Sequence, residues 1–226
     1  MEFVQEDFNG ADELFGGPSA AEWADIDAVL RATPIFLQGS DQRSRQGKPI
    51  FDPKATNAHL TAQCAIRDWK AIPVPDELTA YGVDWDGGKN TILAEWQFSN
   101  YPFLWNNIIR TEAALRNRVN LPHVGVPKGL IVVTKCGMFP ASNSTLYYEQ
   151  ALAQIRPAIE LGVFATPIRL VGLSILEGAR EIQATWSEYG NARYDRAPVV
   201  QRTRRFEVAL KKGGKYGVRK ATFREQ

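Results

Sequence analysis

Three short apolar runs constrain the fold of this 226-residue chain more than any other feature of its sequence. They occupy residues 91–98, 129–134 and 167–173, and they are rich in the aliphatic and aromatic residues that favour strands. Two segments with helical periodicity, residues 102–118 and 145–161, lie between them. Strand, helix, strand, helix, strand is the order of an α/β protein, so we expect a central mixed β-sheet flanked by helices.

The character of the chain changes after Leu176. Short alternating segments follow, for example residues 181–186 and 205–210, and such alternation is typical of half-buried strands. We therefore expect a core over residues 1–176 and a small β-rich subdomain over residues 177–226.

Composition excludes several classes of protein and site. Cys64 and Cys136 stand outside any CxxC motif, so we expect reduced core thiols in a cytoplasmic protein. Two histidines, His59 and His123, are too few and too far apart for a zinc site. No apolar run approaches the roughly 20 residues that cross a bilayer, and the acidic N-terminus is unlike a signal peptide. A hydrolase mechanism that uses one of the two histidines stays open, but the composition favours chemistry that rests on carboxylates.

The small net charge of +2 hides an uneven distribution. Residues 193–226 hold eleven Lys and Arg against three Asp and Glu, a balance of +8, whereas residues 1–192 hold sixteen against twenty-two, a balance of −6. A basic segment on an acidic body is typical of proteins that bind a polyanion. A solvated basic edge or tail would give the same charge pattern.

Glu95 and Gln97 are the polar residues of the first apolar run. They are two residues apart, so in a strand they share one face at a separation of about 7 Å. A carboxylate buried there without a partner would be costly, so Glu95 should meet a cation, a hydrogen-bond donor or a metal.

Asp86 precedes this run across a turn, and the position of the turn decides whether Asp86 reaches Glu95. A turn at Gly87-Gly88 would leave the two carboxylates about 20 Å apart. A turn at Lys89-Asn90 would place Asp86 opposite Leu93, in one row with Glu95. Only this second register assembles a site, and it is the one we expect.

Two carboxylates in that row, with the main-chain carbonyl of Trp96, would suit Mg²⁺. A metal held by Asp86 and Glu95 could polarise a phosphate and lower the pKa of an attacking water. Spacing alone allows another interpretation, an exposed hairpin with ordinary surface charges.

Six blocks of sequence then give a family resemblance. In the same order, over roughly residues 10–196, they resemble the BglII-like type II restriction endonucleases of the PD-(D/E)xK nuclease superfamily. The blocks are SDQ at 40–42, IFDP at 50–53, QFSNYPFL at 97–104, MFPASNS at 138–144, LYYEQ at 146–150 and PIRLVGL at 167–173. The last thirty residues resemble that family poorly.

The resemblance implies a PD-(D/E)xK core with an added β-rich subdomain, and a homodimer that clasps palindromic double-stranded DNA. It assigns Asp86 and Glu95 to a Mg²⁺ ion, for which Mn²⁺ is expected to substitute. It places Gln97 where the superfamily carries a lysine, so Gln97 could orient water or phosphate without supplying charge.

The resemblance also implies the reaction and its setting. The product would carry a 5′-phosphate on a 5′ overhang, and the target would be a GATC-centred hexamer like AGATCT. The setting would be a prokaryotic cytoplasm that also holds a cognate DNA methyltransferase.

Base readout, by the same resemblance, is assigned to five side chains: Ser99, Asn100, Asn143, Ser144 and Tyr194. Asparagine pairs with adenine through two hydrogen bonds, and hydroxyl groups adapt to donors or acceptors. Residues 142–144 could instead cap a helix that begins near Thr145, and Asn100 could be a turn residue before Pro102.

Five arginines near the C-terminus are expected to contact phosphates, which positions a duplex without reading its sequence. They are Arg193, Arg196, Arg202, Arg204 and Arg205. Trp96, Trp105 and the loop at 193–196 depart from the family pattern, and a changed loop could alter the outer base pair of the target.

Two other functions stay open. The chain could be a DNA-binding module without catalysis, because the lysine is missing, or a repair nuclease on the same core. If the chain dimerises, we expect residues 102–118 and 145–161 to form the contact.

Overall fold

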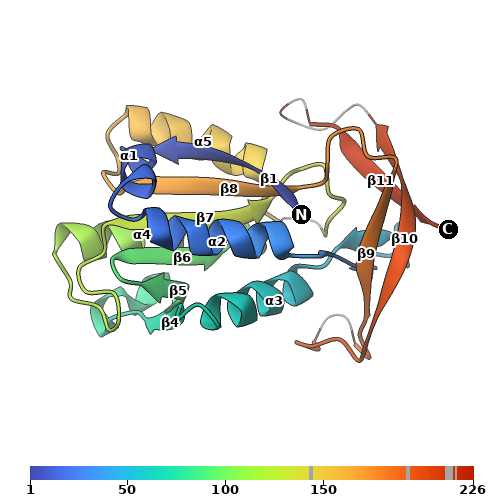
Figure 1. Ribbon diagram of the computed structural model, residues 1–226, viewed down its shortest axis with the longest axis horizontal. Helices are drawn as coiled ribbons and strands as arrows, with labels where there is room; N and C mark the ends of the chain where they lie inside the picture. The colour runs from blue at the N-terminus through green and yellow to red at the C-terminus, as the bar shows by residue number, and fades with distance from the viewer. Residues whose placement is uncertain (143–144, 192–193, 212–215, 217) are drawn as a thin grey trace.

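Two β-sheets organise the chain in the computed structural model, which describes all residues except 143–144, 192–193, 212–215 and 217 (Figure 1). The first sheet has the order β1-β8-β7-β6-β5-β4 and the second β11-β10-β9-β2-β3. The first sheet forms the core of the wider part of the molecule, and the second stands at the opposite end, where both β10 and β11 lie.

The first sheet is mixed. Its strands are β1 (Glu2–Phe8), β4 (Lys70–Pro73), β5 (Asp84–Lys89), β6 (Ile92–Trp96), β7 (Gly129–Lys135) and β8 (Ile168–Ser174). The three neighbours β6, β7 and β8 are parallel, and the remaining pairs are antiparallel. The three apolar runs of the sequence are therefore its central strands, as predicted, while the edge strands β1 and β4 were not expected.

Helices cover both faces of this sheet because its central strands are apolar on both sides. The helices are α1 (Ala11–Gly16), α2 (Ala20–Ala32), α3 (Pro53–Ala65), α4 (Pro102–Arg116) and α5 (Tyr148–Glu160), with a 3₁₀ helix η1 (Asp76–Tyr81).

Alternate residues of β6 point to opposite sides of the sheet. Ala94 and Trp96 pack in one hydrophobic cluster with residues of α2 and α3, whereas Leu93 packs in a second cluster with residues of α4 and α5. Glu95 therefore points toward the α4 side.

The second sheet draws on both halves of the chain. Its strands are β2 (Ile35–Gly39), β3 (Pro49–Phe51), β9 (Glu181–Glu188), β10 (Val200–Lys211) and β11 (Lys220–Glu225). The segment after residue 176 is β-rich, as expected, but its strand β9 pairs in parallel with β2 from the N-terminal part. A boundary at residue 176 thus marks where the later strands begin, but the second sheet also includes β2 and β3, which come before that residue.

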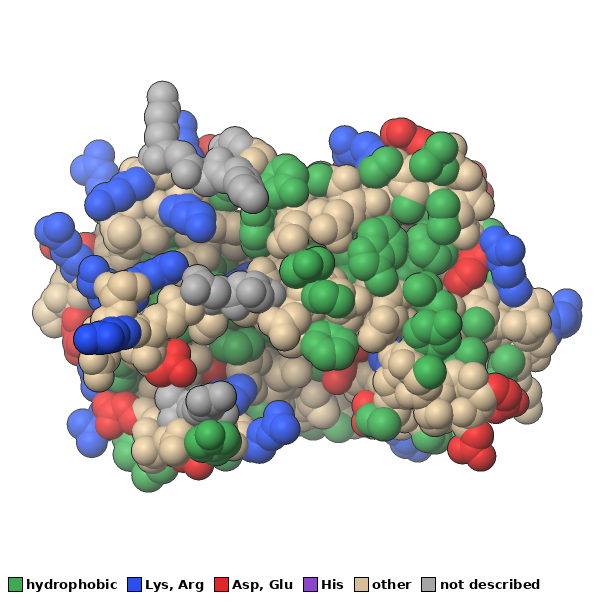
Figure 2. Space-filling view, turned by 180° about the vertical axis from the view of Figure 1, so that it is seen from behind, with side chains coloured by type: hydrophobic (Ala, Val, Ile, Leu, Met, Phe, Trp, Pro, Cys, Tyr) green, Lys and Arg blue, Asp and Glu red, His purple; other side chains and the backbone are tan. Residues whose placement is uncertain are grey.

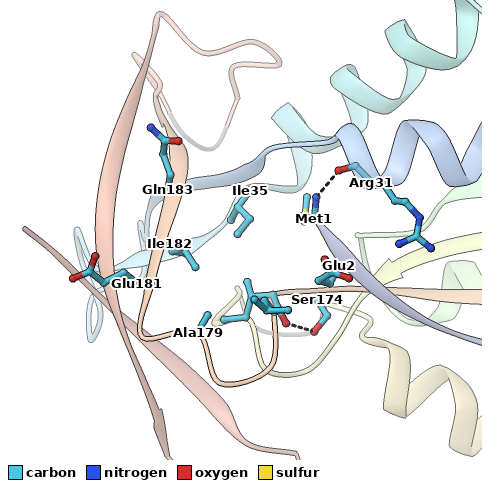
Figure 3. Close-up of a pocket in the computed structure, with 11 residues that line it drawn as sticks. Met1, Glu2, Arg31, Ile35, Ser174, Ala179, Glu181, Ile182 and Gln183 are labelled. Atoms are coloured by element: carbon cyan, nitrogen blue, oxygen red, sulfur yellow. Dashed lines mark hydrogen bonds between the residues drawn. The ribbon is translucent and has the colours of Figure 1, made fainter.

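A hollow of about 350 Å³ lies where the two sheets meet (Figure 3). The ammonium group of Met1 donates there to the carbonyls of Arg31 and Thr33, at 3.1 and 2.8 Å. Ile35 and Ile182 line its other side. None of the candidate site residues lines this hollow, so it belongs to the joint between the sheets.

Both cysteines are buried and unbridged, in agreement with reduced core thiols. Among the described residues, no helix is long and apolar enough to cross a bilayer.

The predicted turn between β5 and β6 was wrong by one residue. Gly88 pairs with Leu93 and Lys89 with Ile92, so the turn is Asn90-Thr91. Asn90 adopts φ of 50°, a left-handed conformation that asparagine tolerates better than most residues. Its side chain also donates to the carboxylate of the buried Glu22, which anchors the turn to α2.

The second helical prediction, residues 145–161, was displaced at its start. The helix α5 begins at Tyr148 and its N-cap is Tyr147. A helix start near Thr145 is therefore wrong; of the residues expected to cap it, Asn143 and Ser144 lie outside the described residues. Pro157 lies inside the helix without ending it, since α5 continues to Glu160.

Candidate active site

Asp86 owes its position to a bulge in β5. Between the paired residues Lys70 and Ile72 the register shifts, because β5 carries one more residue there than β4. Bulges re-aim side chains and are common next to active sites. Here Asp86 Oδ2 accepts a hydrogen bond of 2.7 Å from the main-chain N–H of Trp96, on the neighbouring strand. The carboxylate is thus fixed beside the end of β6.

Glu95 is buried on the α4 side of β6, with 4% of its surface exposed. Its partner is Arg110, which lies on α4 and is 3% exposed. The Nη2 of Arg110 donates to Glu95 Oε1 in a buried ion pair. Glu95 was expected to meet a cation, a hydrogen-bond donor or a metal, and its partner is this guanidinium.

Gln97 is buried at the end of the same row and is held from two directions. Its Oε1 accepts from Asn107 Nδ2 on α4 at 2.9 Å. Its Nε2 donates to Ser99 Oγ at 3.0 Å and to the carbonyl of Asn100 at 3.3 Å. The side chain predicted at the lysine position is therefore a neutral bridge between α4 and the loop after β6.

Burial governs the ionisation of the two carboxyl groups. It raises the pKa of Asp86 above its ordinary value, although the Trp96 N–H works in the opposite direction. It raises the pKa of Glu95 well above the ordinary value, with Asp86 adding to the rise and Arg110 opposing it. The two carboxyls thus lie near enough to affect each other, and such a pair has affinity for a cation.

The loops after β6 and β7 meet beside this row. Asn100 forms a β-bridge with Thr145, and the Leu146 N–H donates to the Ser99 carbonyl at 2.9 Å. The two blocks that carry the predicted base-reading residues are therefore paired with each other. Asn143 and Ser144 themselves lie outside the described residues.

Lys135 holds the loop after β7 in this pairing by hydrogen bonds. It is at the end of β7, 1% exposed, and its ammonium donates to the Leu146 carbonyl and to Thr145 Oγ1. Burial lowers the pKa of Lys135 to about 7.

The remaining predicted DNA contacts come from the second sheet. Tyr194 lies in the β9–β10 connection and is 69% exposed, and Arg196 is exposed in the same connection. Arg193 lies outside the described residues.

The arginines of β10 do not form one surface. Arg202 pairs with Trp186, and Arg204 with Ala184, so these two arginines share one face while Arg205 points to the other. Arg204 also forms ion pairs with Glu188 and Glu225, at 2.8 and 3.0 Å. Its charge is therefore already compensated.

Sequence reasoning missed Asn107 and Arg110. Both lie on α4, one turn apart, on the side that faces β6. Thr111 belongs to the same group, since its Oγ1 accepts from Trp85 Nε1 at 3.0 Å. A row of polar residues at helical spacing inside an otherwise apolar helix face was the signal that could have revealed them.

The donor set can be tested against the metal that it would hold. Among the described residues, no three Asp, Glu, His or Cys side chains gather in one group. Zinc sites need three or four such ligands, whereas Mg²⁺ is commonly held by one or two carboxylates with waters and substrate phosphates. Asp86 and Glu95 fit the second case. The Trp96 carbonyl accepts from the Phe98 N–H at 3.1 Å and keeps a second lone pair.

Comparison with known proteins decides the family. The family described as restriction endonuclease BglII/BglIII matches residues 3–173. The chain belongs to this family. The type II restriction enzyme BglII of Bacillus subtilis is 41% identical over 191 residues, which cover 84% of this chain and 83% of that enzyme.

Two solved structures of BglII are similar over the whole of both chains. The crystal structure of BglII complexed with a DNA 16-mer superposes with a TM-score of 0.89 at 36% identity. The crystal structure of free BglII gives a TM-score of 0.74 at 31% identity. The fold is therefore of the PD-(D/E)xK type, and the arrangement of this chain is nearer to that of the DNA-bound relative.

Membership gives the enzyme class. The chain is a restriction endonuclease of type II, a site-specific deoxyribonuclease, as the sequence blocks implied.

Proposed function

We propose that this endonuclease is a homodimer that hydrolyses double-stranded DNA at a palindromic, GATC-centred hexamer like AGATCT. Mg²⁺ is its metal, Mn²⁺ can replace it, and the products carry 5′-phosphates on 5′ overhangs. One observation carries the proposal: the paired carboxyls Asp86 and Glu95 adjoin Gln97, which is bonded to Ser99 and Asn100 of the loop after β6.

Asp86 and Glu95 would hold the metal, with the Trp96 carbonyl as a third oxygen. When bound, Mg²⁺ supplies Lewis-acid polarisation of the phosphate and a more acidic water. Asp86 is pre-positioned for this role, since the Trp96 N–H already fixes one of its oxygens. Gln97 has no charge to give, so its amide orients neighbouring groups.

The DNA partner is supported by chemistry at the loops. Ser99 and Asn100 offer a hydroxyl and an amide at the edge of the site, and an amide suits the N6 and N7 of adenine. The exposed Tyr194 and Arg196 project from the second sheet, where they could reach a duplex from another side. Figure 2 shows Lys and Arg side chains gathered at the end of the molecule that holds the second sheet.

The homodimer is supported by an apolar surface on the core. Figure 2 shows hydrophobic side chains gathered on the core, on the face that α4 and α5 cover. Phe103 on α4 and Tyr101 just before it are 49% and 45% exposed, and Leu161 and Val163 just after α5 are 81% and 51% exposed. A two-fold contact through α4 and α5 would cover these side chains.

A host that contains such an enzyme needs protection of its own DNA. We therefore expect a DNA methyltransferase that modifies the same hexamer to accompany this chain.

Digestion of a sequenced plasmid with Mg²⁺, followed by mapping of the cut ends, tests the proposal. We expect cuts at AGATCT with four-base 5′ overhangs, in keeping with a GATC centre. Cuts at another palindrome would retain the nuclease and correct the target. Salt-sensitive binding without cleavage would instead identify a DNA-binding protein, and a preference for branched or damaged DNA would identify a repair nuclease.

A further inference from the structure

Arg110 is the one charged group on α4 that reaches the carboxylate row among the described residues. It is as deeply buried as Glu95, since 3% of Arg110 and 4% of Glu95 are exposed. Burial of a guanidinium is costly unless it is paired, so its position needs an explanation in terms of charge.

The segment before Asp86 wraps the guanidinium closely. Arg110 Nη1 donates to the Tyr81 carbonyl at 3.3 Å, and the guanidinium lies 5.0 Å from the centre of the Trp85 ring. A Cβ at Gly82 would lie 2.0 Å from Nη1, and Gly82 has φ of +134°. Only glycine leaves space for the guanidinium at that point.

The guanidinium is not fully used by these contacts. Its Nη2 serves Glu95 and its Nη1 serves Tyr81, but Nε has no hydrogen-bond acceptor among the described residues. The buried N–H donor at Nε thus adds to the cost of burying Arg110.

A charge count shows what Arg110 adds. With both carboxyls ionised, as metal ligands are, Asp86 and Glu95 beside a neutral Gln97 would give a site with two negative charges. Arg110 reduces that to one, which is also the charge of two carboxylates with the lysine that the wider superfamily carries. The positive charge absent from position 97, just after β6, is thus present on α4. Asn107 of the same helix is bonded to Gln97.

We propose that Arg110 is the positioning residue of this site: it holds Glu95 in place and supplies the positive charge that Gln97 lacks. This inference rests on the proposed function, because it assigns a role in the same carboxylate site.

Three variants separate this role from simple fastening of α4. Arg110→Gln removes the positive charge and Arg110→Lys keeps it. The double variant Arg110→Gln/Gln97→Lys removes the charge from α4 and places one at position 97. Arg116→Gln on the same helix is the matched control, because Arg116 is 57% exposed and pairs with Glu112. Each is compared with the unmodified chain in Ca²⁺ binding by calorimetry, in single-turnover cleavage at saturating Mg²⁺, and in thermal unfolding.

We expect Arg110→Gln to bind Ca²⁺ about tenfold more tightly, since the site becomes more negative. The same variant should cleave about 100-fold more slowly, since Glu95 loses its partner. Arg110→Lys should keep the Ca²⁺ affinity of the unmodified chain. The double variant should have a Ca²⁺ affinity near that of the unmodified chain. It should cleave at least tenfold faster than Arg110→Gln.

An unchanged or weaker Ca²⁺ affinity in folded Arg110→Gln would overturn the inference, and so would a double variant as slow as the single one. If the unmodified chain cuts no DNA, the proposed function fails. The Ca²⁺ titrations on the protein alone would still decide the charge role, so the two failures are distinguishable. If Arg110→Gln does not fold, the comparison of Arg110→Lys with the unmodified chain decides instead: a Ca²⁺ affinity that differs by tenfold overturns the inference.

Discussion

Gln97 donates from Nε2 to Ser99 Oγ at 3.0 Å. The same nitrogen donates to the carbonyl of Asn100. A side chain in the carboxylate row is thus bonded to both described members of the predicted base-reading set that follow β6. If these residues have the roles that we propose, base readout and cleavage depend on one hydrogen-bonded unit.

Ser99→Ala should therefore affect recognition and cleavage together. Loss of the hydroxyl removes one acceptor of Gln97 and one group available to a base, and a good base contact is worth roughly 1–3 kcal/mol of discrimination. We expect about a tenfold smaller ratio of cleavage rates between the mapped site and duplexes that differ from it by one base pair. Thr61→Ala, which removes a hydroxyl from the exposed surface of α3, serves as control. An unchanged ratio would separate Ser99 from recognition.

Asp86→Ala should abolish cleavage while the fold persists. The change removes a carboxylate that we assign to the metal, and a thousandfold loss corresponds to about 4 kcal/mol of transition-state stabilisation. Asp84→Ala makes the same chemical change at an exposed position of the same strand, and should cut normally. Plasmid digestion and thermal unfolding measure both effects. Residual cutting within tenfold of the unmodified chain would exclude Asp86 as a metal ligand.

The arginines of β10 should differ in their contribution to DNA affinity. Arg204 is neutralised by Glu188 and Glu225, whereas no ion pair within the described part of the chain includes Arg202. If Arg202 contacts a phosphate, Arg202→Ala should reduce the slope of log affinity against log salt by about 1. Arg204→Ala should change that slope by much less. Gel-shift titrations at several salt concentrations, without metal, make the comparison, and equal slope changes would contradict it.

Lys135 should make the folded protein more stable as the pH rises above 7. Its folded pKa is about 7 and its unfolded value is near 10.5, so the unfolded chain binds more protons between these values. The free energy of unfolding should therefore rise with pH in that window, by roughly 2 kcal/mol from pH 7 to 9. Lys135→Met lacks this titration. Urea unfolding of both proteins at several pH values isolates the effect, because all other groups are shared; parallel curves would refute it.

Phe103→Asp should weaken the proposed dimer. The side chain is half exposed on α4, in the apolar surface that we assign to the two-fold contact, and a carboxylate would be desolvated there. Ile66→Asp is the matched control, since Ile66 is 75% exposed at the end of α3, on the other side of the sheet. Sedimentation should show a monomer for Phe103→Asp and a dimer for Ile66→Asp. A stable Phe103→Asp dimer would place the contact elsewhere.

The central strands were predictable because burial on both faces leaves a continuous apolar run in the sequence. The edge strand β1 was not, because its residues are mostly polar and only its pairing with β8 makes it a strand. The hairpin register could not be fixed either. Two turns looked possible, and the decisive contact, between Asn90 and Glu22, joins residues 68 positions apart.

The candidate site was predictable in part for a similar reason. Asp86, Glu95 and Gln97 are near in sequence, and a family resemblance pointed to them. The bulge that aims Asp86 depends on pairing with β4, and Arg110 meets Glu95 only when α4 packs on the sheet. The polar row on α4 could mark Asn107 and Arg110 as candidates, but their partners are decided by packing between elements that are far apart in the sequence.

The parallel pairing of β2 with β9 affects how this enzyme could be re-engineered. An exchange of residues 177–226 alone with a relative would graft three foreign strands onto a native β2. The backbone bonds would form, but the side chains along that seam would come from two different proteins. A truncation at 176 would leave an edge of β2 open to other chains. Transplantation of the second sheet therefore requires that the segment with β2 and β3 and the segment with β9 to β11 be exchanged together.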